Sequence, residues 1–477
     1  MEPILALIDV GDLTLSGGKE TLQQQLFNAV KAKIVGGLWP LQGRLPSSRK
    51  LSIELGISRN TVNGAYEQLV AEGYVESKPG SGFYVSLELP GNFLPEMDTD
   101  CPIVQPLVSA SRNASFDRGV PELKQFPMKT WNRLIQRHAL RVSLLGSQDI
   151  QGCMALRLAL SEYLSASRSV SCSADNIIIT AGAQQALMIA AMSVLSSHDT
   201  ILMEQPGYTQ MAKIIELNHY QLEPLQVREL IGFDLQDVFR SHARALYITP
   251  SNQYPMGTTL DTEARLQLVK WAQKRQSWII EDDYDSEFQF AHRPYSCLQG
   301  LAAQIGLSKH VMYTGSMSKV MFNGLRLGYL VIPQFHVQRC LEIKDALSGD
   351  SPSHTQAALA DFISEGHLLR HIRKMRRLYK LKHQTLIDNL EHRLGKDVTV
   401  ISQAAGLHVT VKWEGGISEQ EWVERAASYD INIQALSYYE HSRIVNRSWQ
   451  AVVLGFGNMP LEEIGPNIEL LARLFKS

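Results

Sequence analysis

The segment TGSMSKVMFNGLRLGYL, residues 314–330, places an amine and a cation in a setting that favours chemistry. Lys319 follows two hydroxyl residues, Ser316 and Ser318. Arg326 comes seven positions after the lysine, directly before an apolar strand-like run. A lysine that loses its proton is a nucleophile, and an arginine is a preferred partner for an anion. We expect burial and the nearby Arg326 to lower the pKa of Lys319, so the segment indicates a place where an amine meets an anionic ligand.

Other reactive side chains follow short apolar runs elsewhere in the chain. Asp282 and Tyr284 come directly after SWII, and Tyr208 follows TILM. The stretch AGAQ, residues 181–184, follows NIIIT and opens a helix whose first amides can hold an anion. The set offers an amine, a carboxylate, a phenol, an aromatic face and an anion cradle. Pyridoxal 5′-phosphate (PLP) requires these groups, for a Schiff base, the pyridinium nitrogen, the ring hydroxyl, ring stacking and the phosphate.

The local sequence of Lys319 allows two other interpretations. SMSK, residues 316–319, matches the SxxK signature of serine acyl-enzymes, but the SDN and KTG strings that accompany that signature do not occur in the chain. The lysine could also stand on a solvated loop between two strands. The neighbouring groups favour the cofactor site over both.

These groups need a scaffold that brings several loops to one edge. After residue 113, short apolar runs alternate with sequence that is compatible with helices. The runs are NIIIT (176–180), TILME (200–204), ALYIT (245–249), SWIIE (277–281), VMYT (311–314) and RLGYLVI (326–332). This alternation predicts a doubly wound, mostly parallel α/β sheet with ligands at the carboxyl ends of its strands. The last ~90 residues mix both patterns and predict a smaller α+β lobe.

The N-terminal part of the chain has a different pattern. A helical period over residues 21–39 is followed by two capped helical segments within 44–74 and by a β-rich hairpin around PGSG at 74–85. Helix, turn, helix and hairpin together predict a winged helix-turn-helix. Basic residues outnumber acidic ones around its two capped helices, as contact with DNA phosphates requires. These basic residues are Arg44, Arg49, Lys50 and Arg59. A helical packing domain with a solvated basic surface would have the same sequence pattern.

The bulk properties set the frame. The chain has 477 residues, enough for two or three domains, and a net charge of -2. Its five scattered cysteines favour a reducing compartment and give no sign of a metal cluster. It has no basic signal-peptide start and no apolar run long enough to span a bilayer, so we expect a cytoplasmic protein without a membrane partner. The predicted boundaries are 15–86 for the winged helix, 87–112 for a linker and 113–477 for the larger part.

Two resemblances sharpen these expectations. RLPSSRKLSIELGISRNTVNGAYEQLVAEGYVESKPGSGFYV resembles the GntR-family winged helix. EDDYDSEF, TPSNQYPMG, EQPGY and SMSKVMFNGLRLGYL resemble a fold-type I aminotransferase. The combination is similar to the MocR/GabR-type transcriptional regulators over nearly the whole chain. The resemblance implies double-stranded operator DNA, a small amine or amino-acid effector and a head-to-tail homodimer as partners.

The resemblance also assigns roles to residues. It implies that Lys319 forms the Schiff base with PLP. The cofactor would be held by Asp282 at the pyridine nitrogen, Tyr284 at the ring hydroxyl, Tyr208 by stacking, Asn252 from TPSNQYPMG, and Ser316, Ser318, Arg326, Ala183 and Gln184 at the phosphate. The positions that would contact DNA are Arg49, Ser58, Arg59, Asn60, Thr61 and Gly80.

Two departures from the aminotransferase pattern concern the ligand. The arginine that often precedes the final strand is absent from AVVLGF, residues 451–456, so Arg443 or Arg447 would have to grip an effector carboxylate, or another group does so. Ser147 stands where a partner-contacting aromatic is usual. The basic run RHIRKMRRLYKLK, residues 370–382, predicts a solvated helix face or a supporting DNA contact.

The leading hypothesis is therefore a regulator that senses an amine, an amino acid or PLP itself through an aldimine at Lys319. An active aminotransferase whose N-terminal module is a DNA tether is the main alternative. A DNA-binding protein whose large domain only dimerises is the third. The sequence does not name the effector or the operator.

Overall fold

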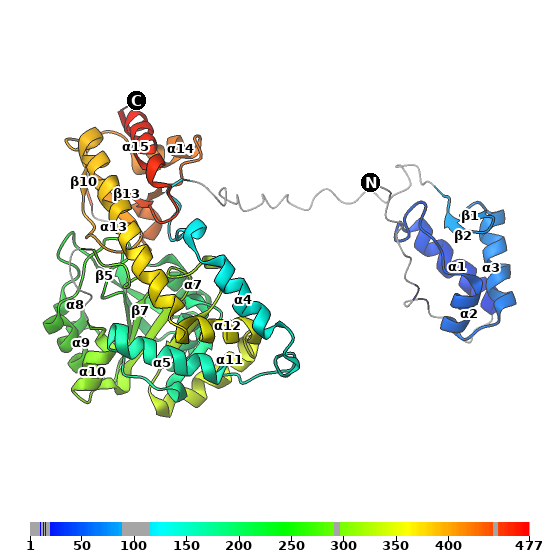
Figure 1. The fold of residues 1–477 in the computed structure, drawn as a ribbon, viewed down its shortest axis with the longest axis horizontal. Helices are drawn as coiled ribbons and strands as arrows, with labels where there is room; N and C mark the ends of the chain where they lie inside the picture. The colour runs from blue at the N-terminus through cyan, green and yellow to red at the C-terminus, as the bar shows by residue number, and fades with distance from the viewer. Residues whose placement is uncertain are drawn as a thin grey trace. The chain divides into compact units, whose positions relative to one another are not determined.

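A computed structural model of the chain forms two compact units, Met1–Val108 and Ser109–Ser477 (Figure 1). The structure describes Val10, Leu13, Leu15 and residues 20–87, 115–290, 296–441 and 447–476. Within these residues, no helix is long and apolar enough to cross a membrane.

The described part of the first unit is a winged helix-turn-helix, as predicted. It consists of helices α1 (Leu22–Val35), α2 (Ser48–Leu55) and α3 (Arg59–Ala71) and an antiparallel hairpin of β1 (Val75–Lys78) and β2 (Gly82–Val85). The side chains of Ser47 and Ser58 accept hydrogen bonds from the first turns of α2 and α3. Gly56 ends α2 at φ 66°, a left-handed conformation that favours glycine. Local capping thus sets the boundaries of both helices.

The first unit has its own apolar core. The helical period of α1 buries Leu26 and Val30 against α3, and Tyr66 of α3 is fully buried among them. The Tyr66 hydroxyl donates a hydrogen bond to the carbonyl oxygen of Pro46 at 2.9 Å, which ties α3 to the segment before α2. All the described residues of this core belong to the first unit.

In the second unit, seven of the described strands form one sheet in the order β3-β9-β8-β7-β6-β4-β5. The strands are β3 (Ile177–Thr180), β4 (Thr200–Gln205), β5 (Gln221–Gln226), β6 (Ala245–Ile248), β7 (Trp278–Asp283), β8 (Val311–Ser316) and β9 (Gly328–Val331). β9 is antiparallel to both neighbours and the other pairs are parallel, which confirms the mostly parallel sheet. The predicted strands are all present, whereas β5 was missed.

Helices cover both faces of this sheet (Figure 1). Alternate strand residues point to opposite faces, so Met203 packs with α6 (Ala183–Val194), α7 (Thr209–Leu217) and α11 (Val337–Ser348). Leu202 packs on the other face. The helices there are α8 (Leu235–Arg240), α9 (Thr262–Arg275) and α10 (Leu298–Gln304). The sheet is doubly wound, as expected. α4 (Met128–Ala139), α5 (Met154–Arg168) and α12 (Ser353–Ser364) pack together beside β3.

The C-terminal residues form the smaller lobe. Its antiparallel sheet has the order β10-β11-β13-β12, with helices α13, α14 and α15. Their bounds are β10 (Thr399–Val400), β11 (His408–Trp413), β12 (Gln434–Ala435), β13 (Gln450–Gly455), α13 (His367–Leu394), α14 (Glu419–Ala427) and α15 (Leu461–Lys476).

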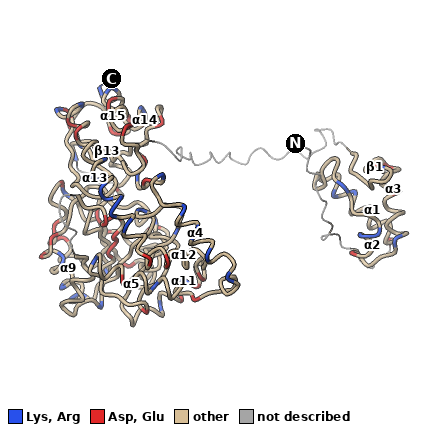
Figure 2. The backbone as a smooth tube through the Cα atoms, in the orientation of Figure 1, with Lys and Arg blue, Asp and Glu red and all other residues tan. Residues whose placement is uncertain are grey.

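The basic run lies on α13, and most of its cations are exposed along that helix (Figure 2). This placement agrees with the solvated-face interpretation for Arg370, Arg373, Lys374, Arg376, Arg377 and Lys380. Lys382 differs from them because it is buried. Its Nζ lies 2.7 Å from Glu122 Oε2 and donates a second hydrogen bond to the carbonyl oxygen of Gly457 at 2.8 Å.

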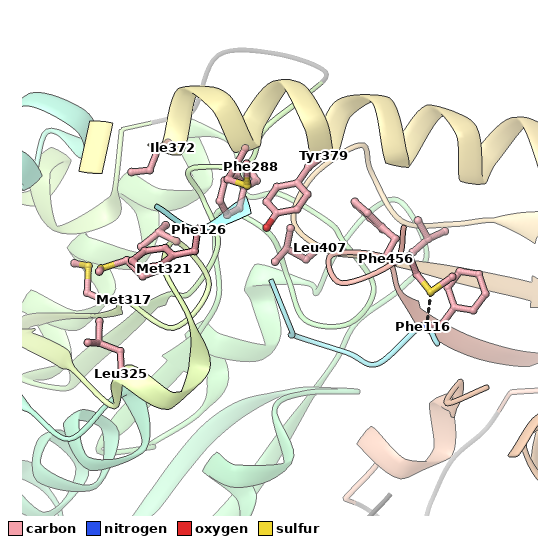
Figure 3. Close-up of a cluster of buried hydrophobic side chains, with 14 of the residues drawn as sticks. Phe116, Phe126, Phe288, Met317, Met321, Leu325, Ile372, Tyr379, Leu407 and Phe456 are labelled. Carbon is pink, nitrogen blue, oxygen red and sulfur yellow. Dashed lines mark hydrogen bonds between the residues drawn. The ribbon is translucent and has the colours of Figure 1, made fainter. Parts of the chain in front are cut away.

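A large apolar cluster joins the lobe to the sheet (Figure 3). Met317 and Met321, on the loop that contains Lys319, point into this cluster together with Phe126. Their burial fixes the loop on both sides of the lysine. Phe116 packs at the other end of the cluster, near Phe456.

The residue before Phe116 is also anchored to the lobe. Ser115 pairs with Ile431 in an isolated bridge, and its amide donates a hydrogen bond to the backbone carbonyl oxygen of Asp430 at 3.1 Å. Its carbonyl oxygen accepts one from the amide of Asn432 at 2.8 Å. The described part of the second unit thus begins as a short strand-like segment held against the small lobe.

The Lys382–Glu122 pair provides a test of the packing. Lys382→Met should lower the free energy of unfolding of the second unit by about 3–5 kcal/mol, because it leaves the Glu122 carboxylate buried without its cation. Urea unfolding monitored by circular dichroism measures this change. Lys380→Met, on the exposed face of α13, is the matched control and should change stability little. Equal effects of the two variants would contradict the assignment.

Candidate functional site

A cavity of about 360 Å³ opens at the carboxyl edge of the large sheet. Most of the predicted cofactor residues line it, namely Lys319, Asp282, Tyr284, Tyr208, Ala183, Gln184, Ser316, Ser318 and Arg326. They come from the ends of β3, β4, β7 and β8 and from the loop between β8 and β9. The expectation that separate loops meet at one edge is therefore met by the structure. Asn252 lies outside the lining.

Lys319 is the nucleophilic group of this cavity. Burial lowers its pKa to about 8, Asp285 and Asp117 oppose the shift, and Arg118 adds to it. The cation that acts on the amine is thus Arg118, and the expectation that Arg326 would do so is wrong. An amine with this pKa is neutral far more often near neutral pH than an ordinary lysine, and its neutral form is the nucleophile.

Gly119 leaves room for the lysine nitrogen. A Cβ atom at this position would lie 2.0 Å from Lys319 Nζ, and the residue has φ 75°. The positive φ favours glycine here, and any side chain would displace the lysine amine. The carbonyl oxygen of Gly119 accepts a hydrogen bond from Asn323 Nδ2 at 3.3 Å, so the peptide that backs the amine is held from the β8–β9 loop.

Asp282 is buried at the end of β7. It accepts hydrogen bonds from the Tyr247 hydroxyl at 2.8 Å and from the Thr314 hydroxyl at 3.3 Å. Burial raises its pKa to about 6, and these two donors oppose the shift. No described lysine, arginine or histidine lies within ion-pair distance of its carboxylate. A ligand with a positively charged N–H would therefore find an anion here without a competing cation.

A second line of groups supports Tyr284. The Tyr284 hydroxyl donates a hydrogen bond to the carbonyl oxygen of Asn252 at 2.9 Å. Asn252 Nδ2 donates to Asp285, while Asn252 Oδ1 is buried without a partner in the described structure. Burial raises the pKa of Asp285 to about 7. Asn252 thus supports Tyr284, which lines the cavity, and Asp285, and its expected contact with the cofactor stays a prediction.

The anion-binding end is built by the start of α6 and by Arg326. Gly182 precedes α6 at φ 91°, and the first two residues of this helix, Ala183 and Gln184, line the cavity. Arg326 adopts the left-handed conformation, φ 50°, uncommon for a residue with a side chain. It donates a hydrogen bond to the carbonyl oxygen of Ala181 at 3.0 Å. The Ser316 and Ser318 hydroxyls lie 2.9 Å apart on the facing loop.

Of the two arginines considered for an effector carboxylate, the structure describes Arg447. Arg447 pairs with Glu419 at 2.8 Å and with Glu440 at 2.8 Å, and it does not line the cavity. Arg443 lies outside the described residues. Ser147 is exposed and does not line the cavity either.

Sequence reasoning missed several residues of the cavity. Tyr247 and Thr249 lie in and directly after the apolar run ALYI, where they look like core positions. Arg118 and Gly119 also line the cavity, although FDRG follows the linker-like sequence far from the other motifs. The available signal was the charged residue Arg118 followed by Gly119, in the segment that precedes helix α4 of the second unit.

The candidate DNA-contacting residues gather around the start of α3. Arg49, Arg59 and Asn60 are exposed, and Arg59 Nε donates a hydrogen bond to Ser48 Oγ at 3.3 Å, which joins α3 to α2. The Ser58 hydroxyl caps α3 and lies 2.8 Å from the Thr61 hydroxyl. These two hydroxyls therefore serve the helix start as well as any DNA contact.

Gly80 lies in the turn between β1 and β2. Its φ of 74° is a conformation that favours glycine, so the turn explains this residue independently of DNA. The tip carries no large side chain at this point, and close approach to a backbone or groove is sterically open: a Cβ at Gly80 would meet nothing within 4 Å.

Comparisons with known proteins agree with both units. Residues 22–85 match the model of bacterial regulatory proteins, gntR family, and residues 116–445 match that of aminotransferase class I and II. The probable rhizopine catabolism regulatory protein MocR of Rhizobium meliloti is 33% identical over 95% of this chain and 94% of its own. The pyridoxine biosynthesis transcriptional regulator PdxR of Corynebacterium glutamicum is 29% identical over 92% of each chain.

Solved structures resemble the second unit. LysN, an α-aminoadipate aminotransferase from Thermus thermophilus complexed with N-(5′-phosphopyridoxyl)-L-leucine, has a TM-score of 0.70 and 24% identity over 77% of this chain and 93% of its own. A multiple substrate aminotransferase from Thermococcus profundus has a TM-score of 0.70 and 22% identity over 81% of this chain and 98% of its own. At this identity the likeness shows the fold. Because the sequence matches span both units, the chain belongs to the MocR/GabR-type transcriptional regulators, in which a GntR-family winged helix is joined to a fold-type I aminotransferase-like domain.

Proposed function

We propose that this regulator binds PLP covalently at Lys319 and that occupancy of the site, by PLP itself or by an amine-bearing effector, changes its binding to operator DNA. The observation that supports the proposal most directly is the composition of one cavity. It contains an amine of lowered pKa, a buried carboxylate without a cation, and an anion cradle at a helix start. These are the groups that PLP needs.

The residues present fit the cofactor group by group. Asp282 would pair with the pyridine nitrogen, because its hydrogen-bond donors are hydroxyl groups and no lysine, arginine or histidine of the described residues forms an ion pair with it. The start of α6 and Arg326 would hold the phosphate. Tyr208 offers an aromatic face in the same cavity. The bound cofactor supplies an aldehyde for an amine and an electron-poor ring.

The chain's own groups prepare this chemistry. Lys319 is partly deprotonated near neutral pH, and the glycine at 119 leaves its nitrogen unobstructed. Tyr284 would meet the ring hydroxyl from its position on the Asn252 carbonyl. An effector that favours one of two conformations of the protein would shift the balance between them, and this shift would alter DNA affinity.

The DNA side of the proposal rests on the winged helix. The exposed cations Arg49 and Lys50 of α2 would contact phosphates, while Arg59 and Asn60 would reach base edges from the N-terminal turn of α3. Two such modules on neighbouring half-sites require a homodimer, which the resemblance makes head-to-tail.

Covalent capture tests the lysine. Purified protein incubated with excess PLP and reduced with borohydride should carry a phosphopyridoxyl label on Lys319, found by peptide mass spectrometry. Lys319→Ala should lose the label and also any effect of PLP on operator affinity. Lys309→Ala, at an exposed lysine of the same unit, should retain both. A wild-type protein without label at position 319 would falsify the proposal.

The pKa of Asp282 makes stability depend on pH. Because burial keeps this carboxyl protonated up to about pH 6 in the folded protein, the folded state binds more protons than the unfolded chain above about pH 4. Its contribution to the free energy of unfolding therefore falls as the pH rises through this window. Asp282→Asn avoids the loss, and in PLP-free protein its stability relative to wild type should rise by on the order of 2 kcal/mol from about pH 4 to about pH 7.5.

Thermal unfolding across this pH range measures the difference. Asp175→Asn, at an exposed carboxyl, is the control and should show a nearly constant difference. A constant difference for Asp282→Asn as well would mean that this carboxyl is not held protonated by the fold.

Arg59 tests the DNA contact. Arg59→Ala should weaken operator binding by roughly 1–3 kcal/mol if the side chain contacts a base, with a smaller effect on unrelated DNA. Gel-shift titrations at fixed salt measure both affinities. Lys31→Ala, on α1 and outside the proposed interface, is the control. Unchanged operator affinity in Arg59→Ala would count against this role.

A further inference from the structure

We infer that Arg118 binds an anionic group of the effector, so the effector is an amino acid, with an amine and an acid, rather than a plain amine. This inference rests on the proposed function, because it assumes that the amine of the effector is captured in the cavity that contains Lys319. It assigns the acid-binding role that Arg447 does not fill.

Arg118 lies next to the reactive amine. It lines the cavity, and its neighbour Gly119 is so close to the lysine that an added Cβ would lie 2.0 Å from Nζ. Burial is the main cause of the lowered pKa of Lys319, and the charge of Arg118 adds to the shift, so Arg118 acts on the amine. A small ligand whose nitrogen reaches the position of Lys319 Nζ therefore has Arg118 within the span of a few bonds.

The guanidinium of Arg118 is positioned but not neutralised. It donates hydrogen bonds to Gln434 Oε1 and to the Tyr439 hydroxyl, both neutral acceptors on the small lobe. Among the described residues, no carboxylate forms an ion pair with it. The charge of Arg118 acts on the adjacent Asp117, whose carboxyl is outside ion-pair distance and accepts a hydrogen bond from Asn432 Nδ2 at 3.2 Å. The two neutral partners fix the orientation of the guanidinium group, and its other N–H groups remain available to donate hydrogen bonds to an anion.

The cavity has one more cation than the cofactor needs. PLP has a single strongly anionic group, the phosphate, and the start of α6 with Arg326 suits that group. Arg118 is held from a different part of the unit, by β12 and the turn that contains Tyr439. A second anion-binding group in the same cavity therefore points to a second anion, which a plain amine lacks.

Other cations do not compete for this role among the described residues. Arg447 is engaged by Glu419 and Glu440 and lies outside the lining. The described lysines and arginines that line the cavity are Arg118, Lys319 and Arg326. With the amine assigned to capture and Arg326 to the phosphate, Arg118 is the cation that is left for an effector carboxylate.

The test compares each acid with its decarboxylated counterpart. PLP-loaded protein is titrated with L-alanine and ethylamine, with 4-aminobutanoate and propylamine, and with the remaining proteinogenic amino acids and their available amines. The readouts are the change in cofactor absorbance and the change in operator affinity. In wild type, at least one amino acid should act at about 10-fold or more lower concentration than its matched amine, as expected for a hydrogen-bonded Arg–carboxylate pair.

Arg118→Gln should reduce this ratio to near one while leaving the response to amines in place, and Arg118→Lys should retain part of it. Arg240→Gln, at an exposed arginine whose side chain is 78% accessible, is the matched control for loss of one positive charge. Thermal unfolding shows whether each variant remains folded. The ratio is compared within one variant, so a general loss of affinity does not mimic the effect.

Three results would overturn the inference: a wild-type preference for amines, a preference that survives in Arg118→Gln, and an absence of response to every amino acid in the panel. Each is distinct from failure of the proposed function. That failure would appear as an unlabelled Lys319 after borohydride reduction, before any effector is added.

Discussion

The structure around the cavity depends on the burial of four carboxyl groups within five residues. Glu281, Asp282, Asp283 and Asp285 are each at most 6% exposed. A buried carboxylate is costly unless it is protonated, paired or hydrogen-bonded, so every one of them needs its own solution. The end of β7 and the elements around it provide these solutions separately.

Glu281 accepts hydrogen bonds from the amides of Leu298 and Gln299 at the start of α10. Asp283 pairs with Arg168 at 2.8 Å. Both interactions commit these carboxyl groups to structural contacts, and burial raises the pKa of Glu281 to about 7. Asp282 differs in its surroundings, since its donors are hydroxyl groups and it lines the cavity, while burial raises its pKa as well, to about 6. The fold thus uses Glu281 and Asp283 in structural contacts and leaves Asp282, between them, available for a cationic ligand.

The same division of labour applies to the arginines. Arg168 and Arg447 are engaged by carboxylates, whereas Arg118 and Arg326 have neutral hydrogen-bond partners and line the cavity. Neutral acceptors orient a guanidinium without cancelling its charge, so these two side chains remain attractive to anions. The electrostatic character of the cavity follows from which charges the surrounding fold has already satisfied.

Much of this arrangement could be predicted from the sequence, for physical reasons. The strands β3, β4, β6, β7, β8 and β9 were visible because their apolar runs are almost entirely buried, including β3 at one edge of the sheet. The strand β5 was missed because it is an edge strand, where QLEPLQ can be polar and can include Pro224. The antiparallel direction of β9 has no signature in local composition.

The site was predictable where a motif follows a strand, as with Asp282 and Lys319. It was not predictable where the residue is remote in sequence, as with Arg118, or where it lies inside an apolar run, as with Tyr247. The wrong expectation for Arg326 has the same origin, since nearness along the chain was taken for nearness to the amine. The residue that acts on Lys319 comes from about two hundred positions earlier.

The anchored segment at the beginning of the described part of the second unit has a mechanical consequence. Ser115 is hydrogen-bonded to the small lobe, and a few residues later Gly119 touches the lysine nitrogen. The polypeptide that continues toward the winged helix is therefore covalently continuous with the wall of the cavity. Because the small lobe holds Ser115, a few main-chain bonds connect the position of that lobe with the wall of the cavity at Gly119.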